Sequence, residues 1–259
     1  MLDQGIENLV TYNPLAICER ATLGEALSSM DEYHFHHLPV VDQKRRLVGI
    51  VSDLDVRRAA DTRASNVADV MTPSPIAVAH HSSPTEALRI MLERRFHSVP
   101  VLDGDKLIGI ITSTDFLREF SYETASSGDT IAQHMLGDEY HVGADSTVDE
   151  ALRAMDELGC DFLAVLKGTC PVGVVSRRTL TVWTEFSQAT GPTQVKTMQL
   201  AATNVPALLP SDTLQDAARR MLDRGVSVVL VADRANQFVG LLTDIEVLSL
   251  MIERMAVGG

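Results

Sequence analysis

The sequence has 259 residues, 45% of them apolar and 22% charged, so it can bury a substantial core and has a globular composition. Its formal net charge of −13 argues against nucleic-acid or anionic-membrane surfaces, because both kinds of surface require positive charge. No run approaches the roughly 18 apolar residues of a membrane span. The first ten residues lack a signal-peptide pattern, and three cysteines without a Cys-x-x-Cys pair favour free thiols in a reducing cytoplasm.

A unit of about 60 residues recurs four times along the chain. Its helix cap stands at Thr22, Ser83, Thr147 and Thr213, with spacings of 61, 64 and 66 residues. Each cap is followed in the same register by a methionine and then a glycine. These are Met30, Met91, Met155 and Met221, and Gly49, Gly109, Gly173 and Gly240. Four copies in step predict a repeat architecture.

Each repeat is expected to fold in the order β-α-β-β-α. A short apolar segment precedes a helix that begins at the Ser or Thr cap, and Pro84 suits the first helical position. In the first repeat the apolar runs Leu38–Val41 and Leu47–Val51 flank a short polar turn, which predicts a hairpin. The second run leads into Ser52, where a closing helix is expected to begin. The repeated methionines fall on the apolar helix face and are predicted core residues.

The predicted fold class is therefore mixed α/β (α+β), with four repeats at residues 1–62, 63–122, 130–186 and 193–259. The polar stretch 121–129 is the best candidate for a boundary between two halves of the chain. The first two repeats are expected to make one half and the last two the other.

Three motifs resemble the cystathionine-β-synthase (CBS) domain family: Asp69–Pro73, Phe96–Val101 and the Gly-Ile-Ile-Thr-x-x-Asp sequence Gly109–Asp115. The resemblance covers nearly the whole chain and is stronger in the first two repeats. It implies that repeats pair into pseudo-twofold Bateman modules with two clefts each, and that two modules stack within one chain or between chains. It also implies a regulatory role, since many family members bind AMP, ADP, ATP or S-adenosylmethionine and signal to a partner.

Two predicted helix starts carry a hydroxyl and a carboxylate one turn apart. These are Ser52 with Asp55, and Thr112 with Asp115. The carboxylate can accept hydrogen bonds from both ribose hydroxyls, while the positive end of the helix dipole favours phosphate. The same pairs are also ordinary helix caps that need no ligand, so both interpretations stay open.

Further ligand-binding candidates surround these pairs in the sequence. The resemblance implies that the position of His36 and His97 faces a nucleotide and that two segments frame its adenine. The remaining candidates are Leu15, Ala16, Ile76 and Ala77 in those segments, Thr11 and Thr72 in the opening segments, and the neighbouring His37, Arg57 and Arg58. The arginines could also be solvated surface groups, and the histidines could be satisfied hydrogen-bonding groups.

The last two repeats depart from this pattern. Thr179 replaces the carboxylate in the third repeat, and the longer Glu246 replaces it in the fourth. Pro39 and Pro100 become Ala164 and Leu230, and no histidine matches His36. The second module is therefore expected to be mainly structural, or to bind a different ligand at Arg177 and Arg178.

We expect a non-catalytic, cytoplasmic regulatory protein that binds AMP, ADP or ATP in its first module and requires no other cofactor. A regulated protein partner and a homodimer through the CBS modules are also expected, without nucleic-acid or membrane partners. One alternative is a ligand-free oligomerisation or adaptor protein. Another is a sensor of S-adenosylmethionine or of a metal, the latter suggested by His34-x-His36-His37. The sequence contains no nucleophile elbow, P-loop or His-Glu-x-x-His motif.

Overall fold

The computed structural model describes residues 5–59, 63–122, 129–186 and 195–257. The chain divides into two compact units, residues 1–115 with 255–259 and residues 116–254. The predicted boundary stretch 121–129 lies mostly outside the described residues. The division between the units falls instead within helix α4 (Ser113–Tyr122).

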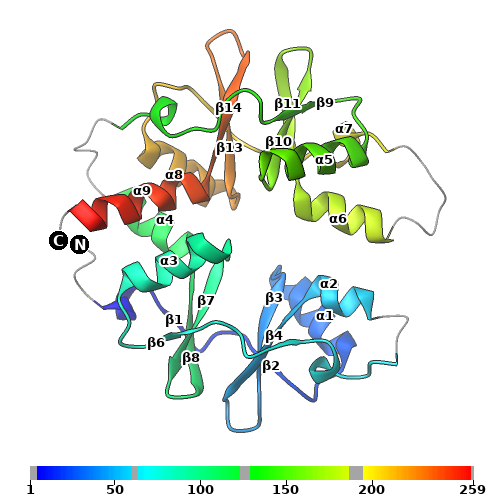
Figure 1. The fold of residues 1–259 in the computed structure, drawn as a ribbon, viewed down its shortest axis with the longest axis vertical. Coiled ribbons are helices and arrows are strands. Elements are labelled where there is room, and N and C mark those ends of the chain that lie inside the picture. Colours follow the sequence, from blue (N-terminus) through cyan, green and yellow to red (C-terminus); the bar gives the residue numbers. More distant parts are fainter. Residues whose placement is uncertain (1–4, 60–62, 123–128, 187–194, 258–259) are drawn as a thin grey trace. The chain divides into compact units, whose positions relative to one another are not determined.

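Each repeat has the predicted order of strand, helix, hairpin and closing helix (Figure 1). The opening helices are α1 (Leu23–Tyr33), α3 (Pro84–Arg94), α5 (Val148–Leu158) and α8 (Leu214–Arg224). The closing helices are α2 (Asp53–Arg58), α4, α6 (Arg177–Phe186) and α9 (Asp244–Val257). A short helical turn introduces each repeat: η1 (Ile6–Asn8), η2 (Val67–Asp69), η3 (Ile131–Gln133) and α7 (Thr197–Leu200). The mixed α/β fold class is confirmed.

The opening helices begin where their sequences predict. The Thr22 hydroxyl accepts a hydrogen bond from the Glu25 amide at 3.2 Å, and the Glu25 carboxylate accepts one from the Thr22 amide at 2.8 Å. All four opening helices have such a capping Ser or Thr. The four repeated methionines are at most 1% exposed, which confirms them as core residues.

The two sheets of the first unit exchange strands between repeats. One sheet has the order β2 (Ile17–Cys18), β3 (His37–Val41), β4 (Leu47–Ser52), β5 (Thr72–Pro73). The other has the order β1 (Thr11–Tyr12), β8 (Lys106–Thr112), β7 (Ser98–Asp103), β6 (Val78–Ala79). Strand β1 thus opens the first repeat but pairs with the hairpin of the second, and β5 opens the second repeat but pairs with the hairpin of the first.

The second unit repeats this arrangement, but single bridges replace the two-residue pairings between repeats. Its sheets have the orders β11 (Cys170–Ser176), β10 (Phe162–Lys167), β9 (His141–Gly143) and β12 (Ala207–Leu208), β13 (Val228–Ala232), β14 (Phe238–Thr243). Single bridges pair Leu136 with Leu241 and Val174 with Ala202, so each hairpin again receives a segment from the other repeat. Buried residues of β10, β11, β13 and β14 form one apolar cluster, which joins the third and fourth repeats.

The hairpins of each unit are also joined at their tips. In the first unit the Leu47 amide donates to the Asp105 carbonyl and the Leu107 amide to the Arg45 carbonyl, both at 3.0 Å. In the second unit the Phe238 amide donates to the Thr169 carbonyl at 3.0 Å. The repeats of one unit are therefore linked through their backbones at the hairpin tips as well as through exchanged segments.

Candidate functional site

The two predicted hydroxyl–carboxylate pairs form caps at the starts of α2 and α4. The Ser52 hydroxyl donates to Asp55 Oδ2 at 2.6 Å, and the Ser52 amide donates to the same oxygen at 3.0 Å. The Thr112 hydroxyl and amide contact Asp115 Oδ2 at 2.7 and 2.9 Å. Both carboxylates are half-buried. Within the described part of the chain, Asp55 uses only Oδ2, so Oδ1 keeps its capacity to accept hydrogen bonds from a ligand.

Strand exchange places a threonine from the neighbouring repeat on each of these strands. Thr72 pairs with Ile50, two residues before Ser52, and Thr11 pairs with Ile110, two residues before Thr112. Both threonines are exposed. Each closing-helix start in the first unit thus combines a cap from one repeat with a hydroxyl-bearing segment from the other.

The three candidate histidines lie at the same end of the hairpins. The His36 carbonyl accepts from the Asp53 amide at 3.1 Å, and the His97 carbonyl accepts from the Ser113 amide at 2.9 Å. His36 Nδ1 also lies 4.0 Å from Asp53 Oδ2. His37 is paired with Ser52 across the β3–β4 ladder. All three imidazoles are exposed beside the helix starts that could receive an anion.

The two candidate arginines lie farther along α2. Arg57 Nη2 lies 3.7 Å from Asp31 Oδ1 on α1, so this guanidinium is directed to another helix. Arg58 is the exposed last residue of α2. The structure therefore brings the histidines and threonines to the caps but gives the arginines no comparable placement.

The four apolar candidates lie on the two segments that cross between the sheets. Leu15 and Ala16 connect β1 with β2, while Ile76 and Ala77 connect β5 with β6. Ile76 is 39% exposed, and the other three residues are half-buried. Sequence reasoning missed this exchange between repeats, which places both crossing segments between the two sheets of the first unit.

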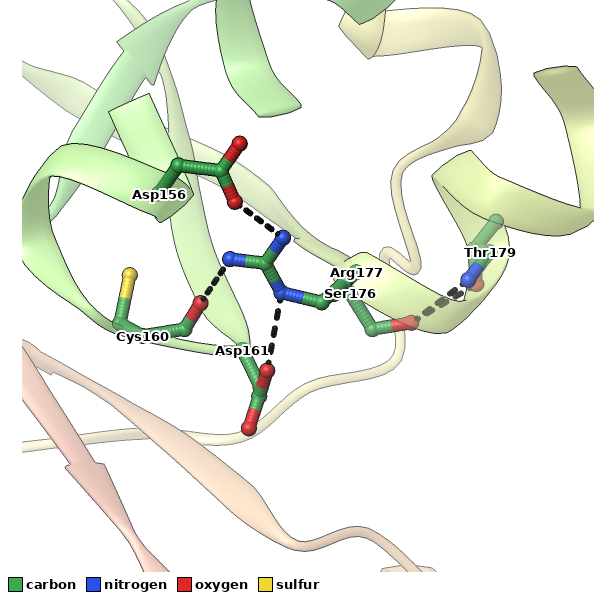
Figure 2. A network of polar contacts seen from close by, with 6 residues as sticks. All are labelled: Asp156, Cys160, Asp161, Ser176, Arg177 and Thr179. Carbon is green, nitrogen blue, oxygen red and sulfur yellow. Dashed lines mark hydrogen bonds and ion pairs between the residues drawn. The ribbon is translucent and has the colours of Figure 1, made fainter. Parts of the chain in front are cut away.

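The matching positions of the second unit are occupied by internal contacts. Figure 2 shows the Arg177 guanidinium between Asp156, Asp161 and the Cys160 carbonyl, at 2.6, 3.0 and 3.1 Å. Burial disfavours its charge, but hydrogen bonds to the two carboxylates outweigh burial and raise the pKa of Arg177. The prediction that Arg177 binds a ligand is not supported, because these contacts already engage the guanidinium.

The fourth repeat and the crossing segment of the third also differ from the first unit. The Thr243 hydroxyl and amide donate to Glu246 Oε2 at 2.5 and 2.9 Å, and burial raises the pKa of Glu246. Tyr140 matches Leu15 and Ile76 in register, and it packs against the core of the third repeat and against the cluster between repeats. Side chains of the protein itself thus occupy this part of the second unit.

No group of three or more His, Cys, Asp and Glu residues suited to a metal ion occurs in residues 5–59, 63–122, 129–186 and 195–257. The predicted His34-x-His36-His37 metal site therefore has no geometric support among the residues searched. In the same ranges, no helix is both long and apolar enough to cross a membrane.

These repeats define a known class of domain, because a family model for the CBS domain matches residues 6–61, 67–122, 131–183 and 197–253. The chain belongs to the CBS domain family and contains four CBS repeats in tandem. The resemblance noted in the sequence is thereby confirmed.

Comparisons with individual proteins find similar sequences over part of the chain and similar folds over most of it. Inosine-5'-monophosphate dehydrogenase from Methanocaldococcus jannaschii is 35% identical over 122 residues, which cover 47% of this chain and 23% of that enzyme. The crystal structure of protein MJ1225 from the same organism has a TM-score of 0.75 and 19% identity, with 96% of this chain and 100% of that chain covered. The crystal structure of a conserved protein from Pyrococcus horikoshii has a TM-score of 0.66 and 20% identity. It too covers 96% of this chain and 100% of its own. The chain thus spans about a quarter of the curated enzyme, while its fold extends over both structures.

Proposed function

We propose that this protein is a non-catalytic regulatory protein whose first unit binds an adenine nucleotide, AMP, ADP or ATP, between its first two CBS repeats. The second unit has a structural or docking role. The observation that carries this proposal is the contrast between the units at matching positions. The first unit presents capped carboxylates, exposed hydroxyls and exposed imidazoles together. In the third repeat Thr179 replaces the carboxylate, and Asp161, at the position of His36, is engaged by Arg177.

The chemistry of the first unit suits a nucleotide. Asp55 and Asp115 offer acceptors to ribose hydroxyls, because a carboxylate has about four lone-pair sites and the cap uses only some of them. The N-terminal ends of the closing helices favour a negative phosphate, and neighbouring imidazoles can add donors. Ile76 and Leu15 supply apolar surface for a flat base. Each requirement of a nucleotide therefore has a matching group in the first unit.

Regulation would follow from the exchanged segments. A ligand that contacts Asp55 of the first repeat and the 72–77 segment of the second stabilises one arrangement of the two repeats. A partner protein that binds this arrangement better then responds to ligand concentration by population shift. A homodimer through the CBS modules and a location in the cytoplasm complete the proposal.

A ligand-free adaptor is the second candidate, and the completeness of the caps favours it. The two hydrogen bonds of the Ser52 hydroxyl with Asp55 recur between Thr213 and Asp216. There the Thr213 hydroxyl donates to the carboxylate at 2.7 Å, and the Asp216 amide donates to that hydroxyl at 3.1 Å. Adaptor function requires only these caps and the surfaces of the two units.

Asp55→Ala tests the proposal, with Asp216→Ala as its matched control. Both changes remove the carboxylate of a helix cap, so each should lower the free energy of unfolding by about 1 kcal/mol. Only Asp55→Ala should also weaken nucleotide binding, by roughly tenfold or more, because a charged hydrogen-bond acceptor is worth about 1.5–3 kcal/mol. Calorimetric titration measures the affinity and urea unfolding measures the stability. Equal nucleotide affinity in both variants would favour the adaptor.

A further inference from the structure

One arginine near the end of α9 contacts groups outside its own repeat. The Arg254 guanidinium pairs with the carboxylate of Asp129, which directly precedes the third repeat. Its central carbon also lies over the Phe120 ring of α4, 5.4 Å from the ring centre. The Arg254 side chain is 31% exposed and that of Asp129 is 25% exposed, so solvent only partly screens the pair. Arg254 therefore links the closing helices of the second and fourth repeats to the start of the third.

Helix α4 begins in the first unit and is anchored in the second. Its start carries the cap formed by Thr112 and Asp115, whereas the residues from Phe116 onward belong to the second unit. Phe116 and Phe120 have no exposed surface, and Leu117 is 3% exposed. A helix of ten residues is a rigid rod about 15 Å long. The cap at its start is therefore tied to the position of the buried phenylalanines.

The closing helices of the first and third repeats are held in a different way. Arg57 Nη2 of α2 lies 3.7 Å from Asp31 Oδ1 of α1, and Arg177 Nη1 of α6 lies 2.6 Å from Asp156 Oδ1 of α5. Both aspartates directly follow the repeated methionine of the opening helix, where the second and fourth repeats have leucine. This ion pair cannot form in the second repeat. Arg254 of the fourth repeat provides α4 with a cationic contact instead.

We propose that Arg254 is a positioning residue for the nucleotide site of the first unit, acting through α4 on the cap at Thr112 and Asp115. This proposal rests on the proposed nucleotide-binding function and states how the second unit takes part in it. The contacts of Arg254 with Phe120 and Asp129 hold α4 in the position that presents Asp115 to a ligand. Without them α4 samples other positions, so the binding-competent fraction and the apparent affinity both fall. By linkage, a ligand bound at Asp115 strengthens the contacts of Arg254 in return.

The test uses the full chain and three substitutions. Arg254→Met removes the charge and keeps an unbranched side chain, while Arg254→Lys keeps the charge. Arg177→Met is the matched control, because Arg177 is 32% exposed and pairs with two aspartates of the second unit, but lies on α6. Calorimetric titration with AMP, ADP and ATP measures affinity. Hydrogen exchange, with and without nucleotide, reports on the amides of α4 and α9.

Arg254→Met should weaken nucleotide binding by about fivefold or more, the lower end of typical coupling between two sites. Arg177→Met should leave the affinity within about twofold of wild type. Arg254→Lys should retain most of the affinity, because an ammonium group can still pair with Asp129. Without nucleotide, Arg254→Met should speed exchange of the Asp115 and Phe116 amides, and the control should not. In the wild-type chain, nucleotide should slow exchange of the α9 amides near Arg254.

Two results would overturn the proposal. One is unchanged exchange at the Asp115 and Phe116 amides in Arg254→Met, which requires no ligand to observe. The other is an equal loss of affinity in Arg254→Met and Arg177→Met, which would indicate general destabilisation. If the wild-type chain binds no nucleotide, the proposed function fails, whereas the exchange comparison still decides whether Arg254 positions α4. If Arg254→Met does not fold, Asp129→Asn removes the partner charge and leaves the contact with Phe120 for the same measurements.

Discussion

At the scale of single residues, Gly173 and Gly240 are placed where a segment of the neighbouring repeat crosses a hairpin. A Cβ on Gly173 would lie 2.8 Å from the Ala202 carbonyl oxygen, and a Cβ on Gly240 would overlap the Leu136 carbonyl oxygen. Both obstacles are backbone atoms, which cannot rotate away as a side chain can. Glycine therefore allows the close approach on which the exchange between repeats depends.

Gly240→Ala is expected to lower the free energy of unfolding by about 2 kcal/mol or more, because overpacking against backbone requires the crossing segment to move. Gly24→Ala is the matched control. Gly24 is exposed in the first turn of α1, and its nearest neighbour would be 4.0 Å away. This control should be neutral or stabilising by up to about 1 kcal/mol. Urea unfolding measures both, and equal stability of the two variants would contradict the close-approach account.

The sequence located the repeated glycines but did not explain them. The position of each glycine is visible within one repeat, whereas the obstacle belongs to the other repeat of the unit. It lies 29 residues away for Gly173 (202−173) and 104 residues away for Gly240 (240−136). The same limit applied to Arg177, whose partners Asp156 and Asp161 come from α5 and the turn before β10. Local pattern identifies a residue as unusual, but only the tertiary fold identifies its neighbour.

At the scale of elements, the same capping motif has opposite electrostatic consequences in two helices. At the start of α5, hydrogen bonds from Thr147 lower the pKa of the exposed Glu150. At the start of α9, burial raises the pKa of Glu246 more than hydrogen bonds from Thr243 lower it. The position at a helix start therefore does not by itself determine whether the pKa of a capping glutamate is raised or lowered. Solvent exposure decides whether hydrogen bonds or burial has the larger effect.

These shifts predict opposite pH dependences for Glu246→Gln and Glu150→Gln. A raised pKa means that the folded state binds more protons, so the Glu246 carboxylate costs stability as the pH rises above about 4.5, and its replacement should become more favourable toward neutral pH. A lowered pKa stabilises the folded state above about 4.5 and loses this effect on acidification, so Glu150→Gln should become less favourable toward neutral pH.

Unfolding free energies of the two variants and the wild-type chain at pH 4, 5, 6 and 7 measure these trends. Slopes of the same sign for both variants would contradict the assignment of burial as the dominant effect at Glu246.

Helices and hairpins were predictable because their signals are local. Caps identified the starts of α1 and α3, and apolar runs around a short polar turn identified β3 and β4 to within a residue. Strands β1 and β5 were not identified, because each has two residues and pairs with a hairpin of the other repeat. The candidate caps at Ser52 and Thr112 were likewise predictable, whereas the placement of Thr72 and Thr11 beside them became visible only once the ladders were known.

At the scale of the whole molecule, one sequence repeat gives two units with different chemistry. The first retains polar groups around its crossing segments, and the second satisfies the equivalent groups with its own side chains and backbone. Four CBS repeats therefore do not imply four equivalent sites. This difference predicts that ligand affinity belongs to the first unit alone.

The most direct measurement is thermal unfolding with and without millimolar AMP, ADP, ATP, NAD and S-adenosylmethionine. A ligand at a hundred times its dissociation constant stabilises the native state by about 2.7 kcal/mol, which raises the midpoint visibly. We predict a higher midpoint with at least one adenine nucleotide, lost in the Asp55→Ala, Asp115→Ala double variant. An unchanged midpoint with every ligand would contradict nucleotide binding and leave the ligand-free adaptor as the function of this chain.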